Sequence, residues 1–151
     1  MKRSTILALA LCLLAAIAGC GSSNNNPANV GLFGNWNITM YPTNNPNPAY
    51  VFALAMSQEG TSTYSGASIR YTGGVAVPPN MCIDPNSLRA TATTGTNNTF
   101  TMTITDTSTD TIISVTGSLT SQTTSLTGNY TNPSSNACPQ SSGTMTMTPQ
   151  G

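Results

Sequence analysis

Apolar and polar residues alternate along much of the chain, and one stretch alternates without interruption. Between Asn98 and Thr105, the apolar residues Phe100, Met102 and Ile104 are each flanked by threonines. A period of two residues is typical of a β-strand with one buried face and one solvated face, and the branched side chain of threonine fits a pleated surface. No segment of comparable length shows helical spacing of apolar residues. The pattern therefore predicts an all-β domain.

The same template, applied to the whole chain, predicts eight strands. They cover residues 35–41, 50–58, 61–71, 86–94, 99–105, 111–120, 123–131 and 143–148. The positions expected to point inward are Trp36, Ile38, Met40, Phe52, Leu54, Met56, Leu88, Ala90, Phe100, Met102, Ile104, Ile113, Val115, Leu126, Tyr130, Met145 and Met147. The third strand is ambiguous, because Ile69 and Tyr71 share one face while Tyr64 lies on the other.

Short and long connections alternate along these strands, which suggests a topology. The tight turns are Glu59-Gly60, Gly95–Asn98 and Ser121-Gln122, and the longer connections are 42–49, 72–85, 106–110 and 132–142. If successive strands alternate in direction, every short turn falls at one end of the domain. We therefore expect an eight-stranded antiparallel up-and-down meander that closes into a small barrel and so removes its edges. A two-sheet β-sandwich is the alternative.

The N-terminal residues have the features of an export signal. Lys2 and Arg3 precede an unbroken apolar run from Ile6 to Ile17, which is shorter than the roughly 20 residues of a transmembrane helix. The run ends in Ile17-Ala18-Gly19-Cys20, which resembles the lipobox of bacterial lipoproteins. That resemblance implies cleavage before Cys20 and attachment of diacylglycerol to its thiol. The alternative is ordinary signal-peptidase cleavage that leaves Cys20 unmodified.

This resemblance divides the chain into residues 1–19 as signal peptide, 20–31 as lipidated cysteine and flexible tether, and 32–151 as one β domain. It implies a cell-envelope protein whose partner is a membrane, reached through the lipid anchor. Gly21 follows the cysteine in place of aspartate, which by the same resemblance favours the outer over the inner membrane.

Charged residues are scarce, and this narrows the possible functions. After residue 19 only Arg70 and Arg89 are basic, so a surface for nucleic acid is not expected. The chain contains no histidine, which removes the usual general base and excludes histidine-containing catalytic triads. We therefore expect a protein that is not an enzyme.

Two cysteines, Cys82 and Cys138, remain in the exported chain if Cys20 carries lipid. Two thiols in an oxidising compartment most simply pair as a disulfide. Both lie in long connections, which the meander places at the same end. They cannot complete a tetrahedral zinc site without histidine.

The segment Leu32–Ile38 resembles the Gly-x-Trp opening of the first strand in the calycin superfamily, which includes lipocalins and avidins. Gly34 and Trp36 are the matching residues. The resemblance implies an eight-stranded barrel that binds a small molecule. Two family features are absent: the last strand, 143–148, carries no basic residue, and the chain has one tryptophan in place of several.

The barrel interpretation favours a non-catalytic binding domain for a small apolar ligand, without a cofactor or metal. The candidate lining residues are Trp36, Met40, Phe52, Met56, Phe100 and Met102. Tryptophan also closes the ends of cores, and methionine also fills irregular gaps in them. The alternative function is therefore a structural or surface-interaction module of the envelope with a filled core. The oxygen-rich segment 106–110 also invites a calcium interpretation, but it lacks the glycine that calcium loops usually contain.

Overall fold

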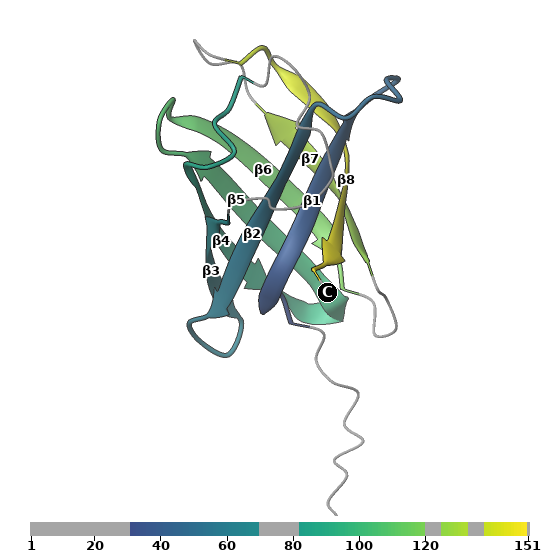
Figure 1. Cartoon of the computed structure of the whole chain (residues 1–151). Coiled ribbons are helices and arrows are strands. Elements are labelled where there is room, and N and C mark those ends of the chain that lie inside the picture. The colour runs from purple at the N-terminus through teal and green to yellow at the C-terminus, as the bar shows by residue number, and fades with distance from the viewer. Residues whose placement is uncertain (1–30, 70–81, 120–124, 133–137, 151) are drawn as a thin grey trace, which may run out of the picture.

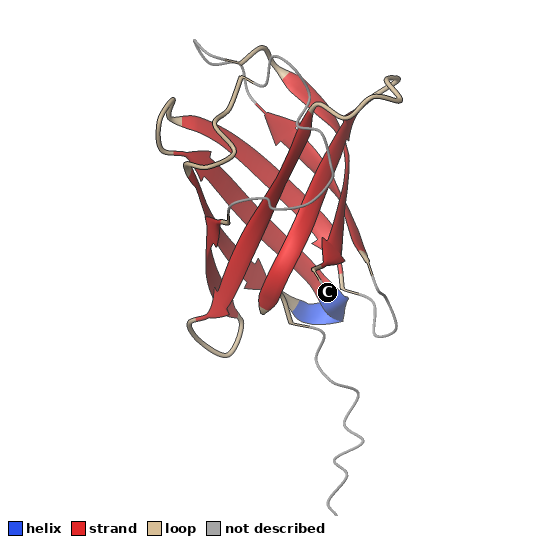
Figure 2. Ribbon diagram, in the orientation of Figure 1, coloured by secondary structure: helices blue, strands red, loops and turns tan. Residues whose placement is uncertain are grey.

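The computed structural model describes residues 31–69, 82–119, 125–132 and 138–150. These residues form eight β-strands and one short 3-10 turn (Figures 1 and 2). The strands are β1 (Gly34–Pro42), β2 (Tyr50–Gln58), β3 (Thr63–Ser68), β4 (Leu88–Thr94), β5 (Thr99–Asp106), β6 (Thr111–Ser118), β7 (Leu126–Asn132) and β8 (Ser141–Pro149).

The eight strands close into a barrel in which each strand pairs with its neighbours in sequence. β1 pairs with β2 on one side and with β8 on the other, and both pairings are antiparallel. The up-and-down meander and its closure into a barrel are confirmed, and the sandwich alternative is wrong. Closure follows from the alternation of apolar and polar residues, because a closed sheet buries one face of every strand and leaves no free edge.

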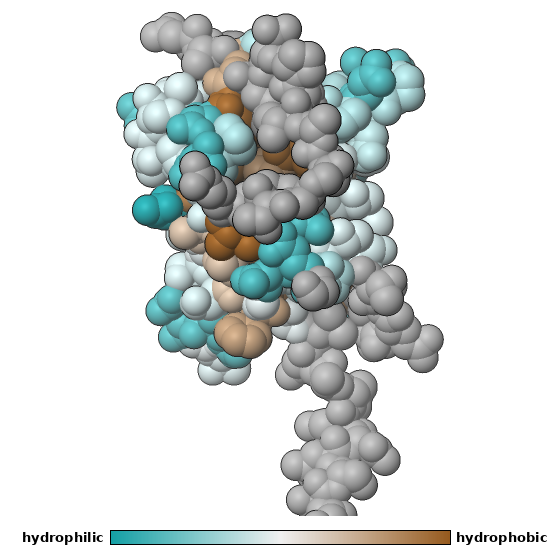
Figure 3. Space-filling model, in the orientation of Figure 1, coloured by the Kyte–Doolittle hydropathy of each residue, from teal (hydrophilic) through white to brown (hydrophobic). Residues whose placement is uncertain are grey.

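The inner face of the barrel is the hydrophobic core. Every residue expected from the sequence to point inward is buried and belongs to one cluster. The cluster also contains Leu32, Tyr50, Tyr64, Ile83, Ala92, Leu119 and Cys138. Outward positions are mostly threonine, serine and asparagine, and Figure 3 shows hydrophilic or near-neutral residues over much of the described surface, with hydrophobic ones between them.

Tyr64 settles the face of the third strand, which the sequence leaves open. Its side chain is buried, so Tyr64 and Gly66 point inward and Ser65 points outward. The strand is also shorter than the expected 61–71, because the chain first makes a turn in which the backbone N–H of Glu59 donates to the carbonyl oxygen of Thr63 at 2.9 Å. The outer face of β2 departs from simple alternation, since Val51 is buried there as well.

The connections fall at two ends, as alternation of strand direction requires (Figure 1). We call the end that holds the β1–β2, β3–β4, β5–β6 and β7–β8 connections the loop end, and the opposite one the turn end. The expected contrast in length holds only in part. The β5–β6 connection, 107–110, is as short as the turn-end connections 59–62 and 95–98.

The β6–β7 connection is longer than expected, since β6 ends at Ser118 and β7 begins at Leu126. The expected Ser121-Gln122 turn lies outside the described residues, as do the signal segment and most of the tether. Within the described ranges, no helix has the length and apolar character needed to cross a membrane.

Candidate functional site

The six residues expected to line a ligand site all lie inside the barrel, but they do not gather at the loop end. Trp36, Met56, Phe100 and Met102 sit toward the turn end of their strands, whereas Met40 and Phe52 sit toward the loop end. All six are buried, with exposed fractions between 0 % and 6 %. The interior residues nearest the loop end are others, described below.

Trp36 closes the turn end of the barrel. Its indole N–H donates to the carbonyl oxygen of Leu32 at 2.9 Å, and both residues are buried. The chain can turn back between them because Gly34 has a φ of 120°, a conformation that residues with a Cβ rarely adopt. The Gly-x-Trp pattern thus has a local physical role here: the glycine permits the bend and the tryptophan fills the space behind it.

The loop end of the interior carries a cluster of polar groups above the apolar core. The side-chain N–H of Asn132 donates to Tyr50 Oη at 2.8 Å and to the carbonyl oxygen of Pro139 at 3.3 Å. The rings of Tyr50 and Tyr130 meet edge to face, with centroids 6.0 Å apart. Asn132 is completely buried, and its two bonds fix the end of β7 against β2 and against the segment that leads into β8.

The phenol of Tyr130 is the exceptional member of this cluster. Its Oη is buried and makes no well-aligned hydrogen bond within the described residues. Burial raises the pKa of Tyr130, the nearby Ser141 hydroxyl opposes that effect, and Tyr50 adds to it. Buried polar groups are nearly always partnered, so this hydroxyl is a candidate contact for a ligand atom or a water molecule.

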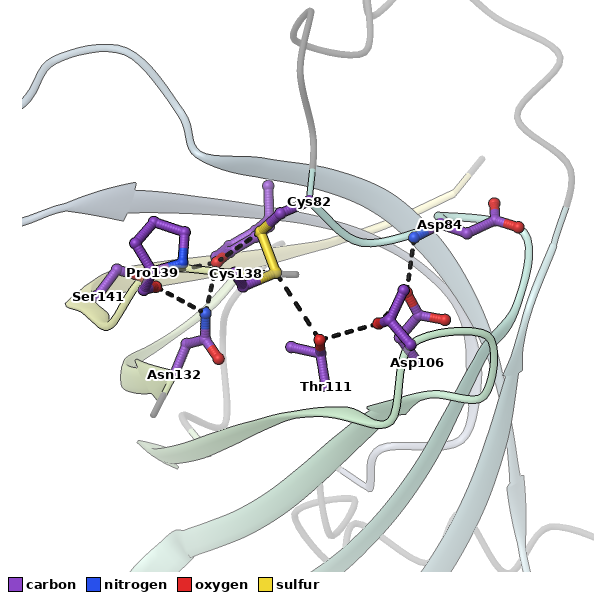
Figure 4. Close-up of a disulfide and its surroundings, with 10 residues drawn as sticks. Cys82, Asp84, Asp106, Thr111, Asn132, Cys138, Pro139 and Ser141 are labelled. Atoms are coloured by element: carbon purple, nitrogen blue, oxygen red, sulfur yellow. Dashed lines mark hydrogen bonds between the residues drawn. A yellow bond between two sulfur atoms is a disulfide. The ribbon is translucent and has the colours of Figure 1, made fainter. Parts of the chain in front are cut away.

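A disulfide spans the same end of the barrel. Cys82 and Cys138 are joined, with their Cα atoms 5.1 Å apart, which confirms the pairing expected from the sequence. Figure 4 shows the bond between the segment that precedes β4 and the one that precedes β8, close to Asn132 and Thr111. Thr111 donates its hydroxyl to Cys138 Sγ at 3.8 Å.

Asp106 organises the neighbouring connections and is not placed to bind calcium. Its carboxylate accepts hydrogen bonds from the backbone N–H of Asp84 at 2.7 Å, the backbone and hydroxyl of Ser108, and the hydroxyls of Ser87 and Thr109. Burial would raise the pKa of Asp106, but these hydrogen bonds together outweigh it and hold the pKa well below its usual range. A cation would have to displace these donors. Within the described ranges no group of three or more His, Cys, Asp or Glu residues could hold a metal ion.

Tyr50 and Asn132 were not among the six residues expected to line a ligand site, although the sequence pattern bears on both. Tyr50 begins the alternation that continues through Phe52 and Leu54, so its inward position follows from the same period of two. Asn132 is two residues beyond Tyr130 and shares its face, but its polar side chain favours a loop in the sequence pattern. The burial of Asn132 could not be predicted from the sequence, because its partners Tyr50 and Pro139 come beside it only when the barrel closes.

The comparisons with known proteins support the fold and do not by themselves establish a function. No family model matches the sequence, and no curated protein matches it either. Among solved structures, the chain is similar to a redesigned β-barrel, b11L5F_LGL, with a TM-score of 0.54 and 16 % identity over 80 % of this chain and 92 % of that one. It is also similar to EF1p2_mFAP2b bound to DFHBI, with a TM-score of 0.54 and 13 % identity over 79 % of this chain and 94 % of that one.

Proposed function

We propose that the protein is a non-catalytic binding module, anchored to the bacterial cell envelope through a lipidated Cys20, that takes a small apolar molecule into the loop end of its barrel. The barrel fold supports the binding role, and a structural neighbour, EF1p2_mFAP2b, was solved bound to DFHBI. The lipobox-like residues 17–20 support the anchor, with the outer membrane favoured over the inner one.

The observation that carries the binding role is the composition of the loop end. An apolar interior that includes Met40 and Phe52 lies below a few convergent polar groups from Tyr50, Tyr130 and Asn132. Ligand sites in proteins typically combine mostly apolar walls with a small number of placed polar groups. The Tyr130 hydroxyl, which has no well-aligned partner in the described part of the chain, would gain one from a ligand that carries a single acceptor.

The anchor and the binding site lie at opposite ends in this proposal. Leu32 and the start of β1 are at the turn end, so a chain leading from Cys20 reaches the barrel there. Twelve residues can extend to about 40 Å, so the tether would let the loop end face away from the membrane. A lipid with two acyl chains is enough for stable anchoring.

Membrane fractionation tests the anchor. We expect the wild-type protein in the membrane fraction and the Cys20→Ser variant to be released from it. A variant that remains membrane-bound at the wild-type level would contradict lipid anchoring. Outer- and inner-membrane fractions, separated by density, then test the location.

Fluorescence titration tests the ligand. Hydrophobic probes are titrated into the chain from residue 20 that carries Cys20→Ser, while the emission of Trp36, the only tryptophan, is followed. Saturable binding at about one site per chain is the expected result. Because Trp36 lies at the turn end, we expect its emission to be quenched by energy transfer to the bound probe and not by direct contact. Weaker binding by Tyr130→Phe, with unchanged stability, would place the ligand at the loop end.

A filled structural barrel is the second candidate, and one observation favours it. Ile38, Met40, Leu54, Leu88 and Ile104 have no exposed surface at all, whereas a void that held even one water would expose part of its lining. A ligand must therefore displace side chains, of which the flexible methionines are the most adaptable. Failure of every probe to bind a cooperatively folded protein would favour this second function.

A further inference from the structure

A concave surface lies on the outside of the barrel, where Tyr130 is the residue that it shares with the buried core. It is a groove of about 750 Å³ between the β1–β2 connection and the outer faces of β7 and β8, at the loop end. Its lining includes the ring-bearing residues Tyr41, Pro42 and Pro46 and the polar residues Asn129 and Thr144. All of its lining residues are uncharged.

The strand register fixes the floor of this groove. Tyr41 pairs with Thr144, and Thr144 pairs with Asn129 on its other side, so the three residues form one row across β1, β8 and β7. Each alternates with inward residues, which places all three on the outer face. Neighbouring strands lie about 4.8 Å apart, so Tyr41 and Asn129 are about 10 Å apart. Along this row the ring of Tyr41 is followed by the hydroxyl of Thr144 and then by the amide of Asn129.

The wall of the groove is held in place by hydrogen bonds. Thr43 donates its backbone N–H and its hydroxyl to the carbonyl oxygen of Ser142, at 2.9 and 3.0 Å. The backbone N–H of Asn45 donates to the carbonyl oxygen of Pro42 at 3.1 Å, and Asn44 adopts a φ of 64° in that turn. Because two prolines and these bonds restrict the wall, little conformational entropy is lost when a ligand binds.

The chemistry of the groove selects among ligands. An ionic ligand would find no charge to pair with, and a purely apolar ligand would bury hydroxyl and amide groups without partners. Asn129 and Thr144 make no side-chain hydrogen bond to the rest of the described chain, so their donors and acceptors are available. Asparagine and threonine each donate and accept, as sugar hydroxyls do, and the tyrosine ring offers a flat apolar face to the C–H groups of a sugar.

We infer that this outer groove is a binding site for a neutral oligosaccharide, with Tyr41 as the stacking platform and Asn129 and Thr144 as hydrogen-bonding partners. Tyr130 belongs to the lining of the groove and to the interior cluster, whereas Tyr41, Asn129 and Thr144 lie on the solvent side of the sheet and belong to the groove alone. A protein with both sites would bind its apolar ligand and its glycan at the same end. The inference does not depend on the ligand proposed for the barrel.

Calorimetric titration with neutral oligosaccharides tests the inference. The probes are maltohexaose, cellohexaose and an oligomer of N-acetylglucosamine, added to the chain from residue 20 with Cys20→Ser. At least one probe should bind, and Tyr41→Ala should weaken that binding about ten-fold or more. Tyr41→Phe keeps the ring and should retain most of the affinity, while Asn129→Ala should lose about three- to ten-fold.

Matched variants outside the groove provide the controls. Phe33 is an exposed aromatic residue, 70 % accessible, at the turn end, and Asn35 is an exposed asparagine of β1. Phe33→Ala and Asn35→Ala should leave oligosaccharide binding unchanged. Because the groove carries no charge, affinity should change less than about two-fold between low and high salt.

Two results would overturn the inference: no binding by any of the probes, or equal binding by wild type and a folded Tyr41→Ala variant. Competition separates this site from the interior one, because a sugar in the groove should not displace a hydrophobic probe bound inside the barrel. Trp36 is buried inside the barrel, so a sugar in the groove should leave its emission unchanged.

Discussion

The backbone N–H of Asp84 donates to Oδ2 of Asp106 at 2.7 Å, across 22 positions of sequence (Figure 4). This bond joins the segment after Cys82 to the end of β5. The same carboxylate holds the β5–β6 turn through Ser108 and Thr109. One buried anion therefore couples two connections of the loop end, and the disulfide couples one of them to a third.

Asp106→Asn should destabilise the protein by about 2–3 kcal/mol at pH 7. The amide keeps the size of the side chain, but its nitrogen faces donors and cannot accept from them, and hydrogen bonds to charged groups are worth about 1.5–3 kcal/mol. Urea unfolding, followed by Trp36 emission, measures the difference. Asp110→Asn is the matched control, because Asp110 is exposed in the same turn and its substitution should change stability by less than about 0.5 kcal/mol.

The stability of the wild type should fall in acid because of the same residue. The pKa of Asp106 is lower in the folded state than in the unfolded chain, where it is about 3.9. Its stabilising contribution is therefore fully present above that unfolded value and is lost as the pH falls toward the folded one. Between about pH 5 and about pH 2, the free energy of unfolding of Asp106→Asn should fall less than that of the wild type. Equal acid sensitivity in both would contradict this role.

Removal of the disulfide should cost about 4 kcal/mol in the chain-entropy model, since the bond closes a loop with a sequence separation of 56. The Cys82→Ala, Cys138→Ala double variant should unfold at lower urea than wild type. A reducing agent should lower the wild-type midpoint toward that of the variant, whose own midpoint should not respond. If complete reduction left the urea midpoint of the wild type unchanged, the disulfide would not stabilise the fold.

Gly34→Ala should destabilise the protein by about 1–3 kcal/mol, although the space around Gly34 is open. The cost arises from the φ of 120°, which an L side chain rarely adopts, and not from a clash. Asn35→Ala, one residue further along β1, is the control and should stay within about 0.5 kcal/mol of wild type. Thermal unfolding of the three proteins, followed by far-UV circular dichroism, decides the point.

Two buried tyrosines should respond in opposite ways to loss of their hydroxyls. Tyr50→Phe removes the acceptor for Asn132 and should cost about 1–3 kcal/mol, because a buried donor is left with one partner fewer. Tyr130→Phe removes a hydroxyl without a well-aligned partner and should be neutral or slightly stabilising. Chemical unfolding of both variants measures the contrast, and equal losses would contradict it.

The pattern of the sequence was sufficient to predict the inside and outside of the barrel. In β5 the alternation of Phe100, Met102 and Ile104 with threonines is strict, and each predicted inward residue is buried. A period of two is a local property of the strand, so no knowledge of distant contacts is needed. The alternation of strand direction likewise placed Cys82 and Cys138 at one end, where they are joined.

The polar contacts depended on positions that only the closed barrel brings together. Asn132 donates a hydrogen bond to Tyr50 across 82 positions of sequence. Tyr41 and Asn129 share one row across β8, because β1 pairs with the last strand. Local periodicity assigns each of these residues a face, but it contains no information about which residues lie beside it. That is set by register and closure, which arise when all eight strands bury their apolar faces together. The sequence therefore determined the strands, the faces of all but the third strand, and the disulfide. The tertiary structure alone decided the face of the third strand, the polar cluster and the outer groove.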